Sequence, residues 1–117
     1  MASQAHVEGL IKLLLVTVGV CGFGSSAWAV DAEAAKTFAR QHNCFTCHAI
    51  DKKKIGPSYQ AVATKYRNNA NAESLLITHV TMGAKMKFPD GHEEDHMAIK
   101  SPDKDQIKNL VAWILTL

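Results

Sequence analysis

The feature that most constrains this chain is the pentapeptide CFTCH at residues 44–48. Cys-x-x-Cys-His is the attachment sequence for c-type haem. In such a site the two thiols, here Cys44 and Cys47, add to the haem vinyl groups, and the imidazole of the adjacent His48 binds iron on one face. The second nitrogen of that imidazole needs an acceptor that fixes the ring plane. We therefore predict one covalently attached haem c held by Cys44, Cys47 and His48.

Two other kinds of site use a Cys-x-x-Cys pair. A zinc site usually has a second pair of ligands at matching spacing, and the only other cysteine is Cys21, in a segment that we expect to be removed. A thioredoxin-like redox pair usually lies in a chain with βαβ patterning, and none is visible here. Haem attachment is therefore the interpretation that the motif favours.

Residues 1–29 are predicted to be a secretory signal peptide and not part of the folded domain. Lys12 gives a weakly basic start, residues 13–20 (LLLVTVGV) form the apolar centre, and residues 27–29 (AWA) form a small-x-small cleavage site. The apolar run is too short to span a bilayer. We expect export to the periplasm, cleavage after Ala29, and no permanent membrane span after cleavage.

The alternative for this segment is an anchor that is retained or lipidated. Glu8 is untypical of the basic region of a leader and favours that alternative. A lipoprotein leader, however, normally carries a small residue before its cysteine, whereas Val20 precedes Cys21. Export also suits the motif, because haem attachment captures a thiol pair that would close to a disulfide in an oxidising compartment.

The remaining residues, 30–117, are expected to form one small domain. The leader takes away one basic residue, Lys12, and one acidic residue, Glu8, so the net charge stays at +2. A chain of this length has only a marginal apolar core unless a disulfide, a metal or a cofactor stabilises it. Haem would supply this stabilisation. Burying on the order of 500 Å² of macrocycle at about 25 cal/mol per Å² contributes roughly 12 kcal/mol, before the entropy cost of ordering the chain is subtracted. We predict that the haem-free chain is poorly folded.

The domain is predicted to be all-α, with about four helices joined by long loops and no convincing strand. Caps and apolar spacing indicate helices at about residues 31–43, 58–67 and 71–82, and a last helix that starts at Ser101-Pro102. Asn43 tolerates the left-handed turn that would deliver Cys44 to the haem. The last helix needs a partner for its one apolar face, and the first helix is the obvious one.

A long loop between Gly83 and Ser101 holds most of the other candidate iron ligands. Loops of this length are usually functional or disordered. A thioether opposite His48 would raise the reduction potential, whereas a second imidazole would lower it. The candidates are Met86, His96 and Met97. His92 and His96 are four residues apart, but Pro89 and Gly91 argue against a helix there, so we expect them to be surface residues.

Four stretches resemble the short bacterial class I cytochromes c: residues 43–51 (NCFTCHAID), 55–59 (IGPSY), 62–66 (VATKY) and 110–115 (LVAWIL). The resemblance covers nearly all of residues 31–117 apart from the long loop. It implies a small all-α fold around one haem, with the first and last helices crossing beside it. It also implies that the Pro57 carbonyl orients His48, and that the axial methionine, placed by its distance from Trp113, is Met97.

The chain departs from that family around the axial methionine. The family usually follows this methionine with two prolines, whereas Ala98 and Ile99 follow Met97. The stretch before Met97 is acidic and carries histidines where the family often has glycine, proline and tryptophan. The partners of the haem propionates are therefore not identified, and His96 and Met86 stay open as alternatives to Met97.

The resemblance implies a single-electron carrier that is not itself an enzyme, because filling both axial positions leaves no place for a substrate. Its expected partners are redox proteins, such as nitrite reductases and terminal oxidases, which dock transiently, in part through the basic run Lys52–Lys54. We expect a monomer and no nucleic-acid partner. The alternatives are a haem c subunit of an exported oxidoreductase complex and a haem protein whose open iron binds small gases.

Overall fold

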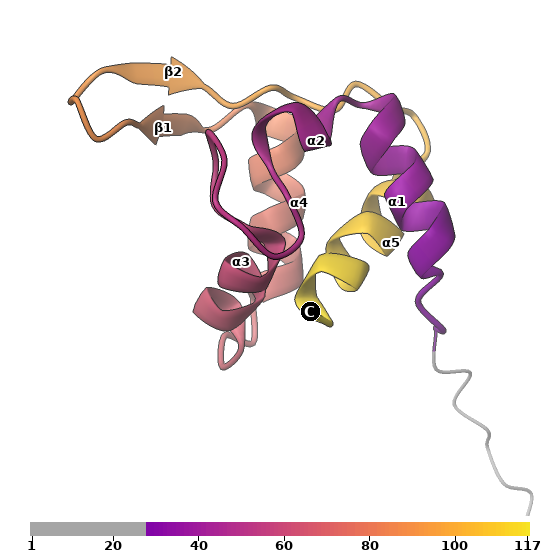
Figure 1. The fold of residues 1–117 in the computed structure, drawn as a ribbon. Coiled ribbons are helices and arrows are strands. Elements are labelled where there is room, and N and C mark those ends of the chain that lie inside the picture. Colours follow the sequence, from indigo (N-terminus) through magenta and orange to yellow (C-terminus); the bar gives the residue numbers. More distant parts are fainter. Residues whose placement is uncertain (1–27) are drawn as a thin grey trace, which may run out of the picture.

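The structure is a computed structural model that describes residues 28–117 (Figure 1). The predicted leader lies outside the described residues, apart from its last two. The elements are α1 (Ala32–Gln41), α2 (Cys44–Cys47), α3 (Tyr59–Tyr66), α4 (Ala72–Met82), β1 (Lys85–Lys87), β2 (Glu93–Asp95) and α5 (Lys104–Leu115). Helices make up nearly all of this regular structure, which confirms the all-α class. In the described part of the chain, no helix has the length and hydropathy of a membrane span.

The first and last helices pack against each other, as predicted (Figure 1). Small side chains allow the close approach, since Ala35 and Ala39 on α1 and Val111 on α5 have no exposed surface. Asn109 adds a polar link at one end of the pair. Its side-chain oxygen accepts from the Asp31 amide at 2.9 Å, and its side-chain nitrogen donates to the Asp31 carbonyl at 2.8 Å. Both groups of the buried amide are thereby satisfied.

Side-chain caps begin three of the helices. Asp31 caps α1 by accepting from the Ala34 amide, and Ser58 caps α3 by accepting from the Ala61 amide. The predicted start of the last helix at Ser101-Pro102 is wrong by two residues. The cap of α5 is Asp103, whose carboxylate accepts from the Gln106 amide at 3.0 Å. A carboxylate at this position is favourable because the N-terminus of a helix carries partial positive charge. The Ser101 hydroxyl does not cap the helix and accepts from the Asp103 amide.

The expectation of no strand is also wrong, because the long loop folds back as a short antiparallel hairpin. Strands β1 and β2 pair with Lys85 opposite Asp95 and Lys87 opposite Glu93. The hairpin projects away from the helices (Figure 1). Gly91 has a φ of 90° in the turn, a conformation that favours glycine. Strands of three residues are too short to show a period of two in the sequence, which is why the hairpin escaped prediction.

Candidate functional site

The CFTCH segment is presented by a left-handed residue followed by a single helical turn. Asn43 has a φ of 57°, as its predicted turn requires. Helix α2 then places Cys44 and Cys47 three residues apart on one face. The two sulfurs are not joined in a disulfide, and both side chains are half-buried. Burial raises the pKa of the Cys44 thiol. Two thiols are thus available on one side of the turn.

His48 leaves this turn in extended backbone, and its ring is held on two sides. Its Nδ1 lies 2.7 Å from the Pro57 carbonyl oxygen. A carbonyl only accepts, so Nδ1 carries the proton and Nε2 keeps a lone pair for a metal. The Tyr59 ring stacks on the imidazole at a centroid distance of 5.3 Å. Burial raises the pKa of the Tyr59 phenol, so that ring stays neutral.

Gly56 makes the close approach of this segment to His48 possible. A Cβ at this position would lie 2.8 Å from His48 Nδ1 and 3.0 Å from Nε2. The Gly56 amide also donates to the Cys47 carbonyl at 2.7 Å. Any larger residue would therefore push against the imidazole that the motif supplies.

A cavity of about 930 Å³ opens beside these groups. It lies among α2, α3, α4, the hairpin and α5, and Cys44, Cys47, His48 and Pro57 all line it. Its volume is at the upper end of the usual range for cofactor sites, about 300–1,000 Å³. The walls carry many apolar side chains, including Val62, Leu76, Val80, Ile99, Leu110 and Ile114. Two thiols, one oriented imidazole and an apolar cavity fit a covalently attached haem.

Three candidate ligands of the long loop lie at the same cavity, in different settings. The His96 ring centroid is 6.1 Å from that of His48. Met97 lines the cavity with a side chain that is 63% exposed. Met86 is half-buried on β1. His92 instead stacks on Phe88 near the tip of the hairpin, as expected of a surface residue. The same expectation for His96 is wrong, because that side chain is half-buried beside His48 and His79.

Helix α4 brings a further histidine to the cavity. The centroid of the His79 ring lies 4.5 Å from the centroid of the His96 ring. Burial lowers the pKa of both imidazoles, so both are neutral near neutral pH. Sequence reasoning did not single out His79, although its spacing of three residues from the buried Leu76 indicates a place on the inner face of α4.

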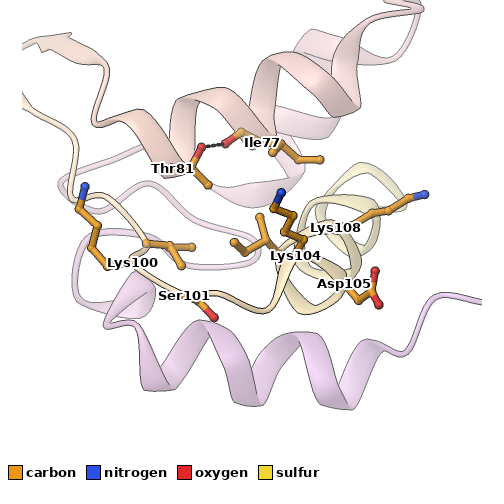
Figure 2. Close-up of a pocket in the computed structure, with 9 residues that line it drawn as sticks. Ile77, Thr81, Lys100, Ser101, Lys104, Asp105 and Lys108 are labelled. Atoms are coloured by element: carbon orange, nitrogen blue, oxygen red, sulfur yellow. Dashed lines mark hydrogen bonds between the residues drawn. The ribbon is translucent and has the colours of Figure 1, made fainter.

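A second hollow, of about 630 Å³, lies between α4 and α5 (Figure 2). The Thr81 hydroxyl donates to the Ile77 carbonyl in its wall at 2.7 Å. Lysines line it, and it has no cysteine or histidine among its lining residues. This hollow therefore does not suit a haem, whereas the larger cavity does.

A family model described as Cytochrome c matches residues 32–117. The chain belongs to the cytochrome c family. It is 32% identical over 95 residues to cytochrome c-551 of Allochromatium vinosum, covering 81% of this chain and 98% of the relative. It is 30% identical over 95 residues to cytochrome c-551 of Pseudomonas aeruginosa, covering 77% and 80%. Among solved structures, the class 1 cytochrome MtoD from Sideroxydans lithotrophicus ES-1 is 60% identical, with a TM-score of 0.70 and coverage of 75% and 97%.

These matches confirm the predicted small class I monohaem cytochrome c. Its cofactor is one covalently attached haem c, for which the chain carries Cys44, Cys47 and His48. A cytochrome c is a haem-based electron carrier with redox proteins as partners.

Proposed function

We propose that this cytochrome c is an exported single-electron shuttle that works in the periplasm after residues 1–29 are removed. The observation that carries the proposal is the arrangement of Cys44, Cys47 and the oriented His48 over one haem-sized cavity. Bound haem supplies the chemistry, since its iron alternates between Fe(II) and Fe(III) by one electron. The proposal includes no catalytic residue, because no side chain is assigned to act on a substrate.

The chain's own residues hold and orient the cofactor. Cys44 and Cys47 fix its position through bonds that do not dissociate. The Pro57 carbonyl accepts from His48 Nδ1 and so sets both the tautomer and the ring plane of the proximal ligand. The proposed shuttle function requires a second axial ligand that closes the iron to small molecules. The sequence register makes Met97 that ligand, and this assignment stays a prediction.

Lysines around the cavity support docking of an acidic redox partner. Exposed Lys53, Lys65, Lys85 and Lys87 all line its rim. Glu94 and Asp95 lie there too, so the rim is basic on balance. Of the predicted run Lys52–Lys54, Lys54 donates to the Phe45 carbonyl within the motif. We therefore extend the proposed docking surface from that run to the whole rim, where positive charge would steer an acidic partner.

A redox titration of the purified holoprotein tests the shuttle proposal. We expect a single reversible one-electron transition, rapid electron exchange with a second cytochrome c, and no change in the reduced spectrum on adding carbon monoxide. A reduced protein that binds carbon monoxide would overturn the proposal in favour of an open-site haem protein. Purification of the haem chain in a stable complex with a catalytic subunit would overturn it in favour of a role as an enzyme subunit.

A further inference from the structure

The hollow between α4 and α5 combines an apolar floor with a rim of lysines (Figure 2). Its volume of about 630 Å³ lies within the usual range for small-molecule sites, about 300–1,000 Å³. We propose that this hollow binds an amphiphilic anion, a molecule with a hydrocarbon chain and one carboxylate or phosphate head group. The proposal goes beyond electron transfer and does not rest on the shuttle function.

Isoleucines from three segments form the floor of the hollow. Ile77 comes from α4, Ile107 from α5, and Ile99 from the loop that connects the hairpin to α5. The Ile99 amide donates to the Val80 carbonyl at 2.7 Å, which fastens this loop to α4. The Thr81 hydroxyl is engaged within α4, where it donates to the Ile77 carbonyl (Figure 2). Such a floor favours a hydrocarbon chain, since each methylene group that leaves water there strengthens binding by up to about fourfold.

The lysines of the rim differ in whether a carboxylate already balances their charge. Lys108 Nζ lies 3.9 Å from Glu73 Oε1. Among residues 28–117, neither Lys100 nor Lys104 forms an ion pair. Both are exposed, and both extend toward α4 (Figure 2). These two ammonium groups are therefore available to the head group of an anion whose chain lies on the isoleucines.

One carboxylate, that of Asp105, also lines the hollow. It lies on the far side of Lys104 from Lys100 (Figure 2). With three lysines and one aspartate, the lining is basic on balance. The aliphatic stems of lysine also cover apolar surface while their ammonium groups stay in water. The hollow therefore suits a ligand with both an anionic head and an aliphatic chain better than it suits a cation or a small inorganic anion.

A nuclear magnetic resonance titration of the reduced, isotope-labelled holoprotein tests the site. Decanoate, added below its micelle concentration, should shift the backbone amide signals of residues 99–108 and of the C-terminal half of α4 in a saturable way. Octanoate should bind more weakly, by up to about 15-fold for the two missing methylene groups. Acetate has the head group without the chain, and decyltrimethylammonium has the chain with the opposite charge. Neither should shift these signals at the same concentration.

A matched pair of double variants separates the site from the effect of net charge. Lys100→Gln combined with Lys104→Gln should weaken decanoate binding by roughly 2- to 30-fold, the effect of losing two exposed charge contacts. Lys53→Gln combined with Lys87→Gln removes the same charge from the haem rim and should bind decanoate as the wild type does. Haem content and far-ultraviolet circular dichroism show whether each variant has folded. The ligand series on the wild type decides the question even if a variant does not fold.

Binding to vesicles identifies the source of the amphiphile once decanoate has been located in the hollow. Co-sedimentation with vesicles of phosphatidylglycerol and phosphatidylcholine that is weakened by Lys100→Gln with Lys104→Gln would support the site and identify a membrane lipid. Decanoate binding without co-sedimentation would support the site and identify a free fatty acid.

Three results would overturn the proposal. One is the absence of a saturable shift at the hollow with decanoate. Another is an equal shift with acetate, which would mean that the lysines attract anions without any contribution from the floor. The third is equal weakening in the two double variants, which would assign the effect to net charge. None of these results bears on the shuttle function.

Discussion

His48 owes its orientation to a short segment that follows it in the chain. The Pro57 carbonyl fixes one nitrogen, Tyr59 stacks on one face, and Gly56 leaves room for the ring. The sequence identified the motif, because Cys-x-x-Cys-His has a fixed chemical meaning, and the resemblance to the class I cytochromes c implied Pro57 as the acceptor. It could not show the role of Gly56, since a missing Cβ matters only once the ring lies against it.

Replacing Gly56 with alanine should therefore disturb the proximal ligand. The new Cβ would crowd His48 Nδ1 at 2.8 Å, so the ring or the backbone must shift. We expect the free energy of unfolding of the holoprotein to fall by about 1–3 kcal/mol, the usual cost of overpacking. Urea unfolding followed by haem absorbance measures the change. Gln60→Ala, at an exposed side chain outside the cavity lining, is the control and should stay within about 0.5 kcal/mol of the wild type. Equal stability of Gly56→Ala and the wild type would show that the ring can move aside freely.

At the scale of elements, caps and apolar spacing predicted α1, α3 and α4 closely, because these signals are local. The start of α5 was predicted two residues early, since Ser101-Pro102 and Asp103 offer competing caps and only the fold shows which one receives the Gln106 amide. The hairpin depends on pairing between segments that carry no apolar alternation. The positions of the candidate axial ligands relative to His48 depend on that hairpin. The sequence alone therefore did not decide among Met97, His96 and Met86 as the second axial ligand.

The link between α1 and α5 through Asn109 should contribute to stability. Asn109→Ala removes both side-chain bonds to the Asp31 backbone and leaves the Asp31 amide without this partner, whereas the Asp31 carbonyl still accepts from the Ala35 amide at 3.0 Å. The expected cost is about 1–3 kcal/mol. Thermal unfolding of the holoprotein measures it, with the exposed Lys104→Ala on the same helix as control. Equal losses in the two variants would show that the cost comes from helix α5 in general and not from this link.

The cap of α5 should make stability depend on pH. The backbone amide of Gln106, helped by its side chain, lowers the pKa of Asp103 below its ordinary value of 3.8. A carboxyl with a lowered pKa in the folded state stabilises above its ordinary pKa, and this contribution is lost as pH falls through the folded pKa. Asp103→Ala should therefore melt at a lower temperature than the wild type near pH 7, and the difference should shrink as pH falls below about 4. Thermal melts at several pH values test this, with Asp105→Ala as control. A difference that stays constant with pH would contradict the role of the charge.

At the scale of the whole molecule, two hollows with basic surroundings differ in what they can bind. The larger cavity holds the thiols and the imidazole, whereas the hollow between α4 and α5 is lined by Lys100, Lys104 and Lys108 without any haem-binding group. The sequence showed only one basic run, Lys52–Lys54, because lysines from α3 and the hairpin reach the haem rim only after folding. The two sets of lysines allow the effect of local charge to be separated from that of net charge.

Lysines at the cavity rim should speed electron exchange with anions more than lysines elsewhere. Lys53→Gln combined with Lys87→Gln removes two exposed charges from the rim, and Lys100→Gln combined with Lys104→Gln removes two from the other hollow. Stopped-flow oxidation of the reduced protein by ferricyanide should be slower in the rim variant by about two- to fivefold at low salt, since electrostatic steering raises association rates by 10-fold or more. The rates should converge toward 1 M salt, where the screening length is only about 3 Å. Equal slowing in the two double variants would mean that net charge, and not the haem rim, governs the encounter.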